Sequence, residues 1–118
     1  MDYTKNLTLV LNTKDRPIFL NTLLYYYSSV GFRGQLIICD ASSNENLEIN
    51  KSLVRKWNSL VIKYNKIREK QIPSIIACLD QIDTNYAGVI CDDDLLCYTG
   101  LNKSILLLEN NRYIKSVW

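Results

Sequence analysis

The stretch YAGVICDDDLL, residues 86–96, runs an apolar segment directly into three consecutive carboxylates. Its apolar part, residues 86–91, has the composition of a buried strand. Adjacent carboxylates repel one another unless a proton or a cation intervenes, and a like charge raises the pKa of its neighbour. Aspartate also caps helices well and is favoured at their N-termini. The stretch therefore predicts a strand that ends in a cation site or in a polar helix cap, formed by Asp92, Asp93 and Asp94.

The rest of the chain alternates β-rich runs with segments of helical periodicity. Such alternation is typical of α/β proteins in which helices cover both faces of a parallel sheet. Pro17 suits the first turn of a helix, and Gly31 suits a helix end. The expected strands are residues 7–13, 35–42, 60–64 and 86–92, with a candidate last strand at 112–118. The expected helices are residues 16–31, 42–57, 72–82 and 99–111.

Apolar side chains that recur at helical spacing predict which face of each expected helix is buried. The four predicted stripes are Phe19, Leu23, Tyr27 and Val30; Ile49, Leu53 and Trp57; Ile72, Ile75, Ile76, Leu79 and Ile82; and Leu101, Ile105 and Leu108. Ser43 or Asn44 precedes the second helix, and we expect one of them to cap it.

Composition and charge bound the class of protein. The 118 residues suit one domain, residues 1–118, and a hydrophobic content of 47% is enough for a core. The net charge is only +2, and the 14 basic residues are spread along the chain. Because a dedicated nucleic-acid binder shows a denser basic surface, we expect no nucleic acid as a partner. The chain has no histidine and no CxxC pair, which excludes histidine-based nucleophilic catalysis and argues against a zinc site.

The cysteines indicate a reducing environment. Cys39 and Cys91 lie inside apolar runs and Cys78 lies within a helical pattern, so we expect buried, reduced thiols. The N-terminal segment MDYTKNLTLV lacks the layout of a signal peptide. No apolar run reaches the ~18 residues of a membrane span. We therefore expect a soluble, cytoplasmic protein with no transmembrane segment.

Polar and charged residues follow every expected strand. In open parallel sheets, ligands bind beyond the carboxyl ends of the strands, where the strand order reverses. Mg²⁺ or Mn²⁺ would suit an acidic cluster at that edge, because both bind carboxylate oxygens and keep positions open for phosphate. Side chains alternate along an extended segment, which predicts Asp92 and Asp94 on one side and Asp93 on the other.

Other residues at the same edge are less specific. Asp40 ends the second strand, where an acid commonly meets a ribose or a base, although a lone acid here could equally be a loop residue or a cap. Lys66 and Arg68 follow the third strand and, taken alone, are typical of a solvated face. Several such features at one edge of the sheet favour a binding site.

Three segments, LTLVLNTKDRPIFLNTLLYYY (7–27), LIICDASS (36–43) and YAGVICDDDLL (86–96), together resemble the nucleotide-sugar-binding half of glycosyltransferase family two, which has the GT-A fold. That family begins with a strand and a Thr-x-x-Arg-Pro-like turn, has an acid after its second strand, and has an Asp-x-Asp element after its fourth. The resemblance implies a Rossmann-like three-layer sandwich with a mostly parallel sheet of order 3-2-1-4. It covers the first half of a typical family domain, so residues 1–118 would be the N-terminal part of a longer enzyme.

The resemblance also implies roles for individual residues. The nucleotide-sugar would contact Thr13, Arg16, Asp40, Lys66, Arg68, Asp92 and Asp93. Among these, Asp40 would meet the uracil or ribose, and Asp92 and Asp93 the ribose and sugar. Asp94, with Asp92 as a second ligand, would hold the Mn²⁺ or Mg²⁺ ion that bridges the diphosphate.

The implied activity is that of a hexosyltransferase in polysaccharide biosynthesis. A UDP-sugar would be the donor, and the acceptor would be a hydroxyl of a glycan or a lipid-linked glycan. The family's catalytic base lies in an acceptor-binding half that has no match here, so no catalytic residue is assigned to this chain. Glu109, late in a helix, is a poor match for that base.

Other classes stay open to different degrees. A receiver-like signalling domain would need paired acids after the first strand and an acceptor aspartate after the third, and residues 12–14 and 65–66 do not match. A haloacid-type phosphatase would need its Asp-x-Asp after the first strand. A non-catalytic nucleotide-binding or interaction module, as a truncated remnant, remains an alternative. A bare strand at 112–118 could pair with another copy and give a homo-oligomer.

Overall fold

Strands and helices alternate along the chain in the computed structural model, which describes residues 2–68 and 71–117 and, of residues 71–74, the backbone only. The strands are β1 (Leu7–Thr13), β2 (Gln35–Asp40), β3 (Val61–Lys66) and β4 (Tyr86–Cys91). The helices are α1 (Pro17–Ser29), α2 (Asn44–Lys56), α3 (Gln71–Cys78) and α4 (Tyr98–Asn110), with short 3-10 turns at Thr4–Asn6 and Leu79–Gln81.

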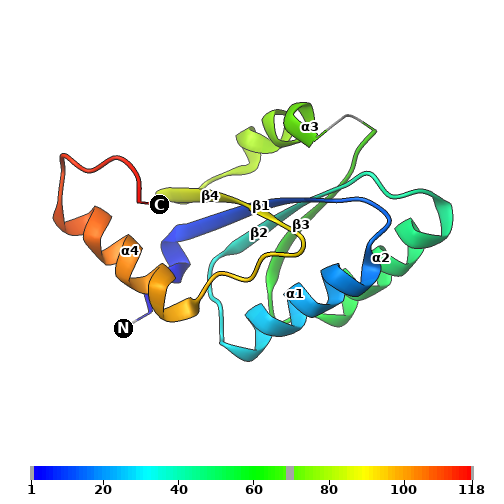
Figure 1. Ribbon diagram of the computed structural model, residues 1–118, viewed down its shortest axis with the longest axis horizontal. Helices are drawn as coiled ribbons and strands as arrows, with labels where there is room; N and C mark the ends of the chain where they lie inside the picture. Colours follow the sequence, from blue (N-terminus) through cyan, green and yellow to red (C-terminus); the bar gives the residue numbers. More distant parts are fainter. Residues whose placement is uncertain (1, 69–70, 118) are drawn as a thin grey trace.

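The four strands form one parallel sheet of order β3-β2-β1-β4 (Figure 1). The predicted α/β fold class and the predicted strand order are therefore confirmed. β1 lies between β2 and β4, and the strand order reverses there, because β2 and β3 extend to one side and β4 to the other. The register pairs Thr13 with Asp40 and Asn12 with Cys91, so the three strands end at the same edge.

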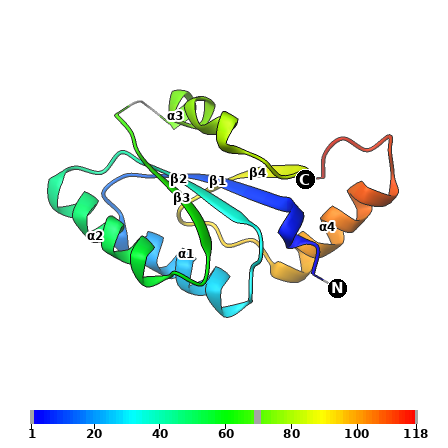
Figure 2. The same cartoon turned by 180° about the vertical axis from the view of Figure 1, so that it is seen from behind.

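Helices cover both faces of the sheet, which gives three layers (Figures 1 and 2). Side chains alternate along β1, so Leu9 and Leu11 join the larger core cluster with side chains of α1, α2 and α4. Val10 points to the opposite face, where it packs with Ile37, Cys39 and Cys78 beneath α3. Nearly every residue of β1 and β2 is buried, since both faces of these strands are covered.

The buried faces of the helices differ in part from those predicted. In α1 the buried stripe includes Leu20 and Leu24, and Phe19, predicted to be inward, is 45% exposed. An apolar helix offers two such registers, one residue apart, and periodicity alone does not choose between them. In α2 the buried residues are Leu47 and Asn50, whereas Ile49 is exposed. Asn50 is buried because its side-chain amide donates a hydrogen bond to the buried carboxylate of Asp40.

The outer helices show a similar mixture. Ile105 of α4 is buried as predicted. Ile76 and Leu79 are exposed, against the prediction for the third helix, whereas Ile75 and Ile82 of the same predicted stripe pack against the cluster that contains Cys78. The side chain of Ile72 lies outside the described residues.

The predicted last strand at 112–118 is wrong for the described part, 112–117, which contains no strand. Tyr113 is 98% exposed there, and β-rich composition forms a strand only where a neighbouring edge pairs with it. Trp118 lies outside the described residues. Among the residues that are described, no helix has both the length and the apolar character needed to cross a membrane.

Candidate functional site

The carboxyl ends of β1 and β4 lie side by side at the reversal of strand order, and two loops leave the sheet there. Thr13 ends β1, and its hydroxyl donates a hydrogen bond of 2.9 Å to Oδ2 of Asp92, which follows β4. The Asp92 carboxylate is only 5% exposed. The 13–16 turn therefore meets the aspartate triplet at the reversal of strand order.

Arg16 joins the two loops through its guanidinium. Nη1 lies 3.0 Å from Oδ1 of Asp92, and Nη2 lies 3.4 Å from Oδ2 of Asp93. The same guanidinium lies 4.1 Å from the centre of the Phe19 ring, a cation–π contact on the exposed side of α1. Both oxygens of Asp92 are thus engaged by protein groups, one by Thr13 and one by Arg16.

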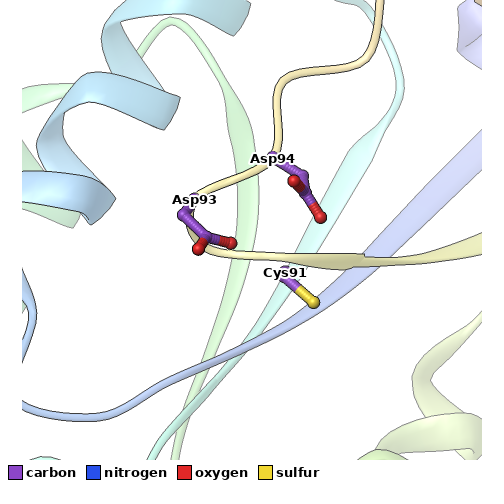
Figure 3. A group of neighbouring side chains, drawn as sticks. All are labelled: Cys91, Asp93 and Asp94. Carbon is purple, nitrogen blue, oxygen red and sulfur yellow. The ribbon is translucent and has the colours of Figure 1, made fainter.

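The aspartate triplet forms a turn instead of continuing the strand. The amide of Asp94 donates to the carbonyl oxygen of Cys91 at 3.2 Å, which closes the turn directly after β4. Asp92 consequently points inward, while Asp93 and Asp94 project outward beside Cys91 (Figure 3). The predicted grouping of Asp92 with Asp94 is therefore wrong, because it assumed an extended backbone.

The outer group of donors fits a hard divalent cation. One ligand atom from each of Cys91, Asp93 and Asp94 lies within 4.8 Å of the others, and all three side chains are exposed. Carboxylate oxygens are the ligands that Mg²⁺ and Mn²⁺ prefer. Desolvation and then the negative charges of Asp94, Asp93 and Asp92 raise the pKa of Cys91. Its thiol is a soft ligand, which hard cations such as Mg²⁺ and Mn²⁺ do not favour. Two carboxylates are therefore the ligands that this turn offers.

Asp40 lies beneath the site and is fully buried. Its Oδ1 accepts the amide of Ser42 at 2.9 Å, and its Oδ2 accepts Nδ2 of Asn50 at 3.0 Å and the hydroxyl of Tyr64. Burial and then the hydrogen bond to Asp40 raise the pKa of Tyr64, which keeps the hydroxyl protonated and donating. This network holds together the carboxyl ends of β2 and β3 and the second turn of α2.

The predicted contact of Asp40 with a base or ribose stays a prediction, because every carboxylate oxygen is already bonded within the fold. Sequence reasoning missed Asn50 and Tyr64. The one available signal was an asparagine on an apolar helical stripe, which needs a buried partner.

Asp15 clamps the first two loops together. Its backbone lies in the left-handed region, at φ 54°, and its amide donates to Oγ of Ser42 at 2.7 Å. Its carboxylate accepts the amide of Ser43 at 2.9 Å and Nδ2 of Asn46 at 3.2 Å, and the Ser43 bond is the main reason why the pKa of Asp15 is lowered. Ser43 occupies the N-cap of α2, but its side chain makes no cap bond. The predicted cap position, Ser43, is therefore correct, but the cap bond expected from its side chain is absent, and Asp15 from another loop accepts the Ser43 amide.

Lys66 and Arg68 lie apart from the aspartate turn. They end and follow β3, which is separated from β1 by β2, and both are exposed. Lys66 is paired in register with Asp40. The nucleotide-binding roles of Lys66 and Arg68 stay predictions. Both residues lie at the carboxyl end of β3, the outermost strand on the side away from β4.

Comparison with known proteins supports the fold. No family model matches the chain, and no curated protein matches it. Among solved structures, the chain is similar to the mannosyltransferase PcManGT from Pyrobaculum calidifontis, in complex with GDP-Man and Mn²⁺. The TM-score is 0.71 at 15% sequence identity, and the match covers 87% of this chain and 32% of that chain.

At that identity the likeness shows the fold alone, which is a Rossmann-like fold that a glycosyltransferase also has. The chain spans about a third of the length of this neighbour. Membership of glycosyltransferase family two stays a prediction.

Proposed function

We propose that this chain is the donor-binding domain of a glycosyltransferase and binds a nucleotide-diphospho-sugar with Mn²⁺ or Mg²⁺. The observation that carries the proposal is the meeting of Thr13 and Arg16 with the three aspartates at the reversal of strand order. Sheets of this kind bind nucleotides at that position. The neighbour of similar fold contains GDP-Man and Mn²⁺, which supports the same ligand class here.

The residues divide the work between metal and nucleotide. Asp93 and Asp94 hold the cation, and Asp92 is a positioning residue, because its oxygens are engaged by Thr13 and Arg16. When bound, the cation supplies positive charge that offsets the charge of the departing diphosphate. Arg16 adds a second, fixed cation beside it, and guanidinium groups bind phosphate oxygens well.

The base end of the donor lies toward the loops after β1 and β2. The hydrogen bonds of Asp40 with Ser42 and Asn50, and that of Asp15 with Ser43, hold these loops in place. The family resemblance favours a uridine donor, whereas the neighbour contains a guanosine donor, so the base is open between these two.

Beyond the triplet, the carboxylates described at this edge are Asp15 and Asp40, and both already accept hydrogen bonds within the fold. Glu109 accepts a hydrogen bond of 3.0 Å from Nδ2 of Asn6, which precedes β1, so it lies at the opposite edge of the sheet. Transfer to a glycan or lipid-linked hydroxyl therefore needs groups from outside these residues, in a further part of the polypeptide or a partner.

Isothermal titration of UDP and of GDP, each with and without Mn²⁺, tests the proposal. We expect one of the two nucleotides to bind only with the metal, and Asp94→Asn to lose the metal dependence while the circular dichroism spectrum is unchanged. Asp80→Asn is the matched control, since it removes the same charge from an exposed residue outside the site. Folded wild-type protein that binds neither nucleotide in the presence of Mn²⁺ would refute the proposal.

A non-catalytic interaction module is the second candidate function. The observation that favours it is apolar surface beside the edge strand, where Val89 of β4 is 60% exposed and Ile76 of α3 is 62% exposed. Self-association or partner capture through this face, together with no nucleotide binding, would favour this candidate. A receiver domain is disfavoured by the strand order, because receiver-like sheets have the order 2-1-3-4-5.

A further inference from the structure

The guanidinium of Arg16 spans two adjacent carboxylates that face different surroundings. Its contact with Asp92 is short, at 3.0 Å, and the carboxylate is 5% exposed. Its contact with Asp93 is longer, at 3.4 Å, and that carboxylate is 46% exposed. A partly buried ion pair is screened less by water than an exposed one, so the ion pair with Asp92 is stronger than the ion pair with Asp93.

Asp93 is also one of the two carboxylates that the turn offers to a cation. Its ligand oxygen lies within 4.8 Å of that of Asp94, while Asp94 makes no ion pair among the described residues. Arg16 and a divalent ion would therefore draw on the same carboxylate. Asp92 does not enter this competition, because Thr13 and Arg16 already bind its two oxygens.

We propose that Arg16 is an internal counter-ion that competes with the divalent cation for Asp93 and is released toward the donor's diphosphate when the cation binds. The inference rests on the proposed function. The contact with Asp92 anchors the guanidinium during the exchange, and the cation–π contact with Phe19 is a second anchor. Of the five N–H donors of the guanidinium, those that leave Asp93 become free for phosphate oxygens.

This arrangement predicts effects of opposite sign for the two ligands. Arg16→Gln removes the competing cation, so Mn²⁺ alone binds more tightly. The same substitution removes a phosphate donor, so the nucleoside diphosphate binds more weakly at saturating Mn²⁺. A residue that served only to stabilise the loop would weaken both.

Electron paramagnetic resonance of free Mn²⁺ measures the first effect directly, without turnover. We expect Arg16→Gln to tighten Mn²⁺ about two- to fivefold, the range set by an exposed ion pair, and UDP or GDP binding to weaken tenfold or more. Lys14→Gln is the matched control for a general change of charge, because Lys14 is exposed in the same loop and no ion pair of the described residues joins it to the triplet. We expect Lys14→Gln to change the Mn²⁺ affinity by less than twofold, and by less than Arg16→Gln does.

A second pair of variants separates competition from simple electrostatics. In an Asp93→Asn background, Arg16→Gln should bring no gain in Mn²⁺ affinity, since the contested carboxylate is gone. Circular dichroism and thermal melting establish that each variant is folded. Wild-type Mn²⁺ binding that is unchanged or weakened by Arg16→Gln, or a gain of equal size in the Asp93→Asn background, overturns the counter-ion proposal and leaves the proposed function intact. Absence of Mn²⁺ binding in every folded variant overturns both.

Discussion

Replacing Tyr64 by phenylalanine tests whether the buried Asp40 network stabilises the carboxyl edge of the sheet. Tyr64→Phe removes one hydroxyl and keeps the ring in its packing position. Asp40 then loses the donor to Oδ2 that comes from β3 and keeps the amide of Ser42 and the side chain of Asn50. A hydrogen bond to a charged group contributes about 1.5–3 kcal/mol to the free energy of unfolding.

Urea unfolding followed by circular dichroism measures this loss. With a denaturant slope of about 1–3 kcal/mol per molar for a small protein, we expect the midpoint to fall by about 1 M. Tyr113→Phe is the control, because Tyr113 is almost fully exposed and its change should stay within about 0.5 kcal/mol. Equal midpoints for the two variants would refute the role given to this network.

The pH dependence gives a second, independent readout. Burial and the hydrogen bond to Asp40 raise the pKa of Tyr64 above its ordinary value of 10.0. A raised pKa stabilises the folded state below the unfolded-state value, and this contribution is lost as the pH rises further. The difference in unfolding free energy between the wild type and Tyr64→Phe should therefore be constant up to about pH 10 and narrow above it. A difference that stays constant at higher pH would contradict the raised pKa.

Three further predictions concern other parts of the fold. Asp15→Ala should lower the urea midpoint because the Ser43 amide loses its acceptor and because alanine tolerates φ 54° less well than aspartate. The difference from wild type should shrink as the pH falls through the lowered pKa of Asp15, and a difference of constant size down to low pH would contradict this account. Gly34→Ala should prevent folding, as judged by circular dichroism, because a Cβ there would overlap the backbone carbonyl of Leu7. Two of the four thiols should react at once with Ellman's reagent and the other two only in urea, because Cys39 and Cys78 are buried and burial raises the pKa of Cys39 to about 12; four fast thiols would refute the packing of α3.

The sheet, and the meeting of the loops that follow β1 and β4, could be predicted from the sequence. The β-rich runs at 7–13 and 35–40 have the composition of doubly covered strands, and both are buried. Because the carboxyl ends of parallel strands meet at one edge, the proximity of Thr13 and Asp92 followed from strand order alone.

The remaining features depend on tertiary contacts that periodicity does not report. Asn50 and Tyr64 reach Asp40 across 10 and 24 residues of chain, so the sequence near each of them does not identify Asp40 as the partner. The triplet forms a turn directly after Cys91, so Asp94 lies beside Asp93 and not, as predicted, beside Asp92. Phe19 lies on the exposed side of α1, and an apolar pattern does not report which register of a helix faces the core.

The two faces of the sheet are unequally packed, and this sets the order in which parts of the fold open. α3 is attached to the sheet through a small cluster formed by Val10, Ile37, Cys39 and Cys78, whereas the opposite face carries the main core. Segments with few buried apolar contacts open with a lower free energy than the whole domain. Backbone amides of α3 should therefore exchange with deuterium by local fluctuations, while those of β1 and β2 should wait for global unfolding. α3 can thus open locally without disturbing Thr13, Arg16 and the aspartates beside them.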